Sequence, residues 1–199
     1  MTKLVTLLLL IPLSLSAVIA KADTNSTKRI LDQAAIVAQA IKAERYDIAA
    51  ALSPPSMVDT SGGVAAYEKK IREELAGFTI LECKPDAVLS TATLDGEMFA
   101  TVSTTLIFTL DNETARINSY LIAFSDDGGR KWCFIGGSES MRKYIQTYSA
   151  EVAQQLNFPD ITMKFDSLSY EKRGDEWVLD KKSRENMKRL LENAKRNKR

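Results

Sequence analysis

The sequence predicts an α+β protein in which N-terminal helices pack on a curved antiparallel sheet of four or more strands. Apolar residues first recur every three or four positions, as they do on one face of a helix. From Phe78 onward, apolar and polar residues alternate instead, as they do along strands. Because these strands follow one another without intervening helices, we expect an antiparallel meander and not a parallel sheet.

Three helices are expected before the sheet. The apolar spacing predicts the first helix over 27–43 and the third over 64–75. Between them, Asp47 is expected to cap a short helix over 47–52. The segment 53–55 contains two prolines and is expected to be a loop, because proline lacks a backbone donor and restricts the residue before it.

Four strands are expected to follow. The first begins at Phe78 and ends near Pro85, and the others cover 98–110, 115–124 and 131–135. The segments between the later strands are rich in Asp, Asn and Gly, which favour turns. Asp126 and Asp127 are therefore interpreted as turn residues, because two acids alone make a poor calcium site.

The remaining chain is expected to form a helical and hairpin extension. Apolar spacing over 138–156 predicts one amphipathic helix that packs back onto the sheet. Segments 161–170 and 176–179 are expected to form a hairpin. The Arg-Gly-Asp triplet at 173–175 then lies in its turn, where Gly and Asp are common.

This order of elements resembles the nuclear transport factor 2-like superfamily, whose fold is the cystatin-like cone. The glycines at 62–63 and the hairpin sequence from Ser125 to Ile135 are similar to a group of exported bacterial proteins of that fold. The resemblance covers about 27–158. It implies a sheet curled around the helices, a pocket at the open end of the cone, and dimerisation through the sheet face. It leaves the activity open.

The first 22 residues have the pattern of a cleaved signal peptide. Lys3 precedes an apolar run over 4–15, and the small residues that follow end at Ala22, which fits the rule for signal peptidase. An uncleaved anchor is the alternative, but Pro12 weakens it. We therefore expect a periplasmic or secreted protein with three parts, namely a signal peptide (1–22), a cone domain (23–158) and an extension (159–199).

The near-neutral total charge conceals a basic tail on an acidic body. Residues 23–180 contain 16 basic and 24 acidic residues, whereas Lys181–Arg199 contains nine basic and two acidic ones. Such a tail is either solvated, lying against the acidic body, or a contact for an anionic membrane surface. No nucleic-acid partner is expected, because an exported protein meets lipid head groups first.

The chain has no histidine, which excludes Ser-His-Asp and Cys-His nucleophiles and His-ligated zinc or haem. No metal or cofactor is expected. An oxidising compartment favours a disulfide between Cys83 and Cys133. The expected strand order instead separates them by about 14 Å, beyond the roughly 7 Å that a disulfide spans, so we expect free thiols.

Candidate pocket residues are the side chains expected at inward or rim positions of the cone: Tyr46, Asp47, Met57, Asp59, Phe99, Tyr120, Trp132 and Phe134. Glu82 is a further acid–base candidate, although a solvent-facing position is expected for it. Each has a structural alternative, because the carboxylates suit caps and loops and the aromatic rings suit a core. No residue is assigned a catalytic role.

The function expected is non-enzymatic binding, either of a small apolar ligand in the cone or of a protein partner, such as a second copy, on the sheet face. One alternative is a cofactor-free lyase or isomerase that uses Asp and Tyr. Another is an envelope-associated accessory protein held by the basic tail. An open cavity with a buried carboxyl group would favour the enzyme, whereas a filled cone would exclude it.

Overall fold

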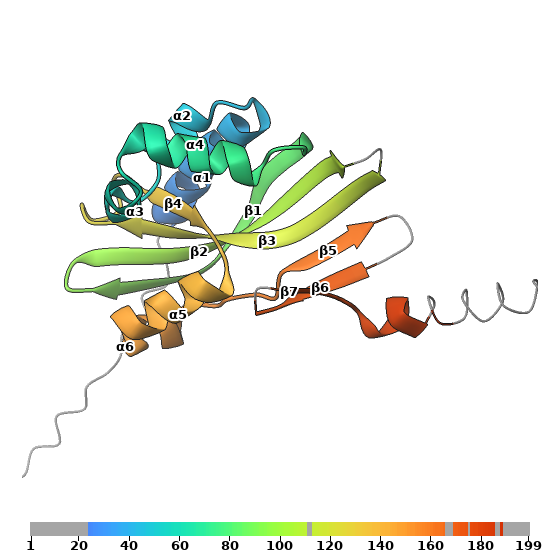
Figure 1. Ribbon diagram of the computed structural model, residues 1–199. Coiled ribbons are helices and arrows are strands. Elements are labelled where there is room, and N and C mark those ends of the chain that lie inside the picture. The colour runs from blue at the N-terminus through green and yellow to red at the C-terminus, as the bar shows by residue number, and fades with distance from the viewer. Residues whose placement is uncertain (1–23, 111–112, 166–168, 175, 186–187, 189–199) are drawn as a thin grey trace, which may run out of the picture.

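The structure is a computed structural model that describes residues 24–110, 113–165, 169–174, 176–185 and 188 (Figure 1). The expected signal peptide and most of the basic tail lie outside these residues. The fold is α+β, as predicted: helices at the N-terminus pack on a curved antiparallel sheet. The elements in chain order are α1 (Thr24–Lys42), α2 (Tyr46–Ala51), α3 (Pro55–Thr60), α4 (Val64–Glu74), β1 (Thr79–Leu94), β2 (Glu97–Leu110), β3 (Glu113–Ser125), β4 (Cys133–Gly136), α5 (Glu139–Tyr148), α6 (Ala150–Gln155), β5 (Thr162–Phe165), β6 (Ser169–Arg173) and β7 (Glu176–Leu179).

The long strands β1, β2 and β3 form the expected meander, and the outer edge of β3 is shared by two further strands. Residues 121–124 of β3 pair with β4, whereas residues 115–118 pair with β5. Strands β6 and β7 extend the sheet beyond β5. The C-terminal extension is therefore continuous with the main sheet through β3.

Helices cover both faces of the sheet at the β4 end of β3 (Figure 1). Neighbouring side chains of a strand point to opposite faces. On β2, Ala100 and Val102 pack in one cluster with Ile30 of α1, whereas Phe99 packs in another with Ile145 of α5. Helices α1–α4 thus lie on one face, and α5 and α6 on the other.

The N-terminal helices differ from the prediction in two places. Asp47 does not cap α2: the helix begins at Tyr46, and the Asp47 carboxylate in its first turn accepts two hydrogen bonds from the Arg45 guanidinium. A short helix that was not predicted, α3, begins at Pro55, the last residue of the predicted loop, and places Asp59 inside a helix. Pro55 opens α3 at a position where the missing N–H would have no helical partner.

The first strand is twice as long as predicted, because Pro85 does not end it. Strand β1 continues to Leu94, and its register against β2 shifts on both sides of the proline, between Pro85 and Ala87 and between Ile80 and Glu82. Proline is tolerated at the edge of a sheet and at such irregularities.

In the C-terminal half, one predicted helix and one predicted strand are each split into two elements. The single helix predicted over 138–156 is broken at Ser149, whose backbone is extended and whose hydroxyl accepts from the N–H of Val152 to cap α6. The first strand of the predicted hairpin is two strands, β5 and β6, so this region holds two hairpins. Residue 175 of the predicted turn lies outside the described residues.

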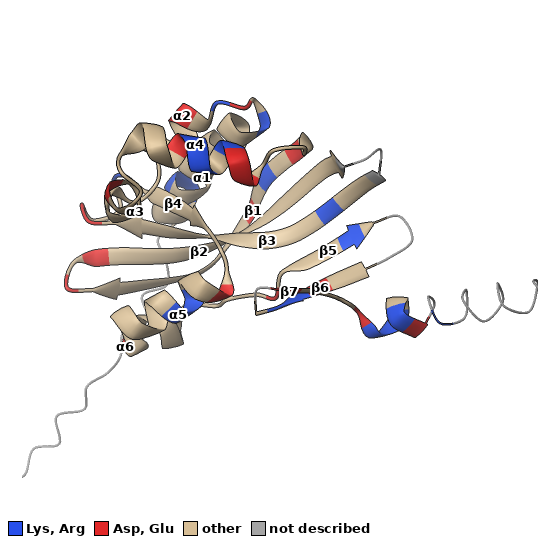
Figure 2. Cartoon of the chain, viewed as in Figure 1, with Lys and Arg blue, Asp and Glu red and all other residues tan. Residues whose placement is uncertain are grey.

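The aromatic residues of the sheet fill the core. Phe99, Tyr120, Trp132 and Phe134 are each 3% exposed or less. Charged residues gather instead on α2, α4 and the turns, and β2 and β3 carry few of them (Figure 2). These four rings therefore occupy part of the space between the sheet and the helices on its two faces.

Candidate functional site: two apolar pockets beside strand β4

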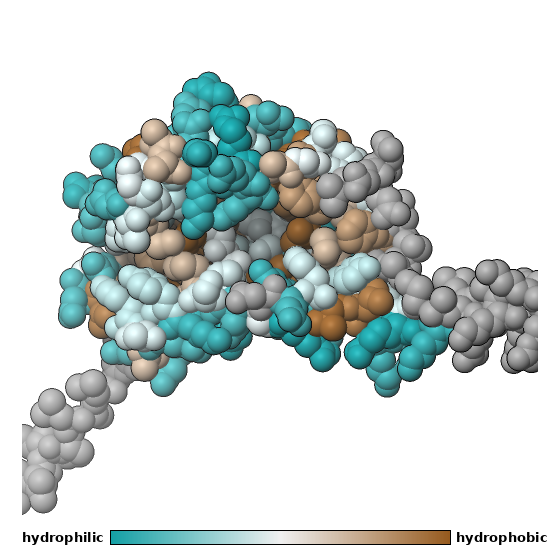
Figure 3. Space-filling view, viewed as in Figure 1, coloured by the Kyte–Doolittle hydropathy of each residue, from teal (hydrophilic) through white to brown (hydrophobic). Residues whose placement is uncertain are grey.

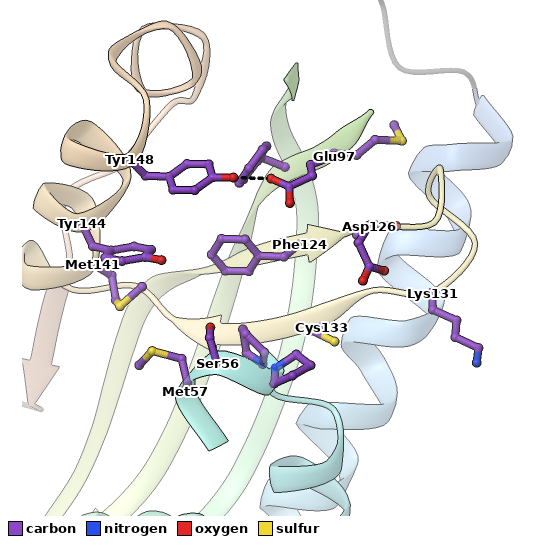
Figure 4. Close-up of a pocket in the computed structure, with 15 residues that line it drawn as sticks. Ser56, Met57, Glu97, Phe124, Asp126, Lys131, Cys133, Met141, Tyr144 and Tyr148 are labelled. Atoms are coloured by element: carbon purple, nitrogen blue, oxygen red, sulfur yellow. Dashed lines mark hydrogen bonds between the residues drawn. The ribbon is translucent and has the colours of Figure 1, made fainter. Parts of the chain in front are cut away.

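A pocket of about 390 Å³ opens between α3, α5 and the ends of β2 and β3 next to β4 (Figure 4). We call it the methionine pocket. Its volume lies in the range of roughly 300–1,000 Å³ that is typical of small-molecule sites. It is lined by Pro54, Pro55, Ser56, Met57, Glu97, Met98, Phe99, Phe124, Ser125, Asp126, Lys131, Cys133, Met141, Tyr144 and Tyr148.

The inner wall of the methionine pocket is apolar and adaptable. Phe99 and Phe124 pack edge to face, with ring centroids 5.6 Å apart. Three methionines complete this wall, one from each of α3, β2 and α5. Methionine is unbranched and polarizable, and it therefore adapts its shape to apolar ligands.

The rim carries the polar groups. The Tyr148 hydroxyl donates a hydrogen bond to the Glu97 carboxylate, and this bond raises the pKa of Tyr148. The rings of Tyr144 and Tyr148 stack with centroids 6.3 Å apart, and about half of each residue is exposed. Asp126 lies across the opening, and the Lys131 side chain extends away from the apolar wall (Figure 4). Negative charge therefore predominates at the mouth.

The turn between β3 and β4 fixes one side of the rim. The Asp127 carboxylate accepts from the backbone N–H groups of Arg130 and Lys131 and from the Ser125 hydroxyl, which lowers the pKa of Asp127. Gly129 has a φ of +81°, and a Cβ there would lie 3.0 Å from the Met98 sulfur. The acids of this turn are thus turn residues, as predicted.

Two contacts from α1 hold the same turn. The Gln33 amide donates to the carbonyl of Arg130, and its oxygen accepts from the N–H of Trp132. The Arg29 guanidinium and the Trp132 indole both donate to the carbonyl of Gly129. The backbone of the rim is therefore braced against the core.

Cys133 lines the methionine pocket, and its thiol is poorly suited to nucleophilic chemistry. Burial raises its pKa, and the charges of Asp126 and Asp127 raise it further, so the thiol is mainly protonated at neutral pH. Cys83 lies in β1, with β2 and β3 between the two residues, and both cysteines are free as the strand order predicted.

A second hollow of about 560 Å³ lies between the helices and the sheet, and we call it the helix–sheet pocket. Its wall includes Ile71 of α4, Leu121 of β3 and Phe134 of β4, and its rim includes Lys70 and Lys172. The hollowed surface is visible below α4 in Figure 3, with apolar side chains beside it.

Three of the predicted pocket residues line these hollows. Met57 lines both, Phe99 lines the methionine pocket, and Phe134 lines the helix–sheet pocket. Tyr120 and Trp132 are instead buried in the core. The Tyr120 ring packs on Phe158 at 6.0 Å, and burial raises the pKa of its hydroxyl.

The remaining candidates lie outside both linings. Tyr46 is buried beneath the Arg72 guanidinium, which lies 5.0 Å from its ring centroid. Asp47 is exposed, and the hydrogen bond from Arg45 lowers its pKa, so it is ionised at neutral pH. Asp59 is exposed on α3, and Glu82 pairs with Lys84 at 3.1 Å.

Sequence reasoning missed the residues that complete the methionine pocket. The helical spacing of Met141, Tyr144 and Tyr148 had indicated one buried stripe. In the structure Met141 is buried, while the two tyrosines reach the pocket mouth. Glu97 directly follows the turn at Asp95 and Gly96, and only the fold brings it opposite α5.

No family model matches the chain, and no significant match was found among curated proteins or solved structures. Within the described residues, no helix is both long and apolar enough to cross a membrane. The same part of the chain contains no group of three or more Cys, Asp or Glu side chains that could hold a metal ion.

Proposed function

We propose that the protein is a non-enzymatic binding protein that takes a small, largely apolar molecule into the methionine pocket. The observation that carries the proposal is an open cavity with an apolar wall of methionines and phenylalanines and with its polar groups at the mouth. Specific small-molecule sites commonly combine such a wall with a few orienting polar groups.

The charges at the mouth favour an uncharged or cationic ligand. Glu97 and Asp126 border the opening, and Lys131 extends away from it (Figure 4). The exposed faces of Tyr144 and Tyr148 add negative π surfaces, which attract cations. An anionic group placed at this mouth would meet like charges.

The arrangement of the polar groups supports binding over catalysis. General acid–base catalysis at neutral pH uses a carboxyl group whose pKa is raised by apolar surroundings. Asp126 is exposed, and Glu97 accepts the Tyr148 hydroxyl at the rim. The lyase or isomerase alternative therefore has no described group in the position that it requires.

The sheet face is a weaker candidate for the functional site. Beyond α5 and α6 it carries a polar network, in which Thr105 bonds to Asp86 and Arg116 bonds to Asn118. Stable homodimer interfaces are usually more apolar than this. Export through residues 1–22 and membership of the nuclear transport factor 2-like superfamily remain part of the proposal, supported by the signal-peptide pattern and by helices packed on a curved sheet.

The test is a fluorescence titration with N-phenyl-1-naphthylamine, an uncharged apolar probe. We expect saturable binding by the wild-type protein and weaker binding of the anionic probe 1-anilinonaphthalene-8-sulfonate. Ser56→Trp places a large side chain at the exposed rim, and we expect it to weaken binding of the uncharged probe about tenfold or more, which corresponds to about 1.4 kcal/mol.

Asp59→Trp is the matched control, because Asp59 is exposed on the same helix and lines neither pocket. Its affinity for the probe should equal that of the wild type. Absence of saturable binding, or equal effects of the two tryptophans, would overturn the proposal.

A further inference from the structure

The methionine pocket and the helix–sheet pocket share part of their walls. Within the described residues, Met57 and Met141 are the side chains common to the two linings. The rest of each lining differs, with Phe99 and Phe124 on one side and Leu121 and Phe134 on the other. The pair therefore forms a partition between two adjoining cavities.

The two methionines come from helices on opposite faces of the sheet, near the edge strand β4. Met57 of α3 packs against the core cluster that contains Met141 of α5, and it also packs against the cluster of Ala50, Val58 and Tyr67. Figure 4 draws both methionine side chains among the residues that line the methionine pocket.

The backbone around the partition is fixed, whereas its side chains can move. The Ser138 hydroxyl accepts from the N–H of Met141 and caps α5, and Pro54 and Pro55 set the start of α3. A methionine side chain has three rotatable bonds and fills irregular spaces. Rotamer changes of these two side chains therefore need no movement of the helices.

We infer that the two pockets are halves of one elongated site, and that its ligand is a single-chain amphiphile whose alkyl chain passes between Met57 and Met141. The inference rests on the proposed function. The walls next to the partition are largely apolar. The charged groups of the linings are Glu97, Asp126 and Lys131 in the methionine pocket and Lys70, Glu74 and Lys172 in the helix–sheet pocket. An alkyl chain needs no polar partner along its length, and its head group stays in water at the mouth beside Glu97.

The test measures how well straight-chain 1-alkanols from hexanol to dodecanol displace N-phenyl-1-naphthylamine. Each buried methylene should improve affinity by about fourfold at most. For the wild-type protein we expect affinity to keep rising through the longest alcohols. A plateau at the chain length that fills the methionine pocket alone would overturn the inference and leave the proposed function intact.

A tryptophan that blocks the helix–sheet pocket tests whether the alkyl chain enters it. Ser140 is exposed at the rim of the helix–sheet pocket and does not line the methionine pocket, so Ser140→Trp should leave probe binding unchanged. We expect its alkanol series to reach a plateau early, with dodecanol at least tenfold weaker than for the wild type. Gln146→Trp, at an exposed position of α5 that lines neither pocket, is the control and should behave as the wild type.

A labelling experiment on the wild-type protein keeps the inference testable if Ser140→Trp does not fold. A long-chain alcohol with a diazirine at the far end of its chain, once photolysed, should label peptides containing Ile71, Leu121 or Phe134. Labelling confined to residues of the methionine pocket would overturn the inference. If the naphthylamine probe itself fails to bind, the proposed function fails first.

Discussion

The two ends of strand β3 have the same alternating backbone but opposite surroundings. At the β4 end (residues 120–125), Tyr120, Ile122 and Ala123 are 3% exposed or less, between helices on both faces. At the β5 end (residues 115–118), Arg116 is exposed and bonds to its neighbours Asn118 and Thr105. The face that is apolar under α5 becomes polar where α5 and α6 no longer cover it.

Both pockets lie at the β4 end, where helices cover both faces of the sheet. A sheet covered on one face can expose polar side chains on the other, and it then has no interior there to hollow out. Around the edge strand β4, where helices cover both faces of the sheet, side chains from helices and strands surround the two cavities.

The largest effect is expected from removing a tryptophan at the β4 end. Trp132 is 1% exposed in the core cluster beside α1, so Trp132→Ala should lower the free energy of unfolding by about 3–5 kcal/mol. Trp177 in β7 is 37% exposed, and Trp177→Ala should cost about 0.5 kcal/mol. Urea denaturation followed by circular dichroism measures both, and equal losses would contradict the contrast between the ends.

The next effect concerns thiol reactivity at the β5 end. Cys83 pairs in register with Leu106, and burial raises the pKa of Cys83 to about 11. At pH 8 its thiolate fraction should be about a hundredfold below that of a thiol whose pKa is near 9. Because only the thiolate reacts, alkylation by iodoacetamide in a Cys133→Ser background should still be rising at pH 10. A rate that levels off near pH 9 would show that this side of the sheet is open to water.

A smaller effect is expected in the polar network at the β5 end. The Thr105 hydroxyl donates to the Asp86 carboxylate at 2.8 Å, and Thr105 is 3% exposed. Thr105→Val should lower the free energy of unfolding by about 0.5–1.5 kcal/mol, whereas Thr105→Ser keeps the hydroxyl and should lose less. If serine and valine are equally destabilising, packing and not the hydrogen bond stabilises this face.

The smallest effect is expected at the turn next to the methionine pocket. The backbone N–H of Lys131, followed by the Ser125 hydroxyl and the N–H of Arg130, lowers the pKa of Asp127. Because the pKa is lower in the folded state, the carboxylate stabilises the fold above its ordinary pKa and loses this effect as the pH falls. At pH 7 the midpoint temperature of thermal unfolding should therefore be lower for Asp127→Asn than for the wild type. The two midpoints should converge as the pH falls toward 2.

The spacing of apolar residues predicted where helices and strands occur better than it predicted where they break or continue. The alternation over 98–110 and 115–124 is strong enough to identify β2 and β3, and their order followed from the short turns. The continuation of β1 through Pro85 could not be predicted, because only an edge position tolerates the proline. The helix breaks at Ser149 because its side chain caps α6 and so competes with a continuous helix. The spacing of apolar residues carries no information about such a cap.

The pocket was less predictable than the fold, because it depends on contacts between distant segments. Met57 and Phe99 were expected at inward positions, and both line the methionine pocket. Met141 was expected on the buried side of its helix. The residue that shares the two linings with it, Met57, lies in α3, more than 80 residues earlier in the sequence. Periodicity indicates which face of an element is buried and not which element it meets.

The attachment of α1 to the turn before β4 has a consequence for how the chain folds. Arg29 and Gln33 bond to Gly129, Arg130 and Trp132, which lie about a hundred residues later in the sequence. Contacts between such distant residues form slowly, because a long loop must close before they contribute. The bonds from Arg29 and Gln33 thus cannot form until the turn before β4 has been made, and the local β2–β3 hairpin can form well before them.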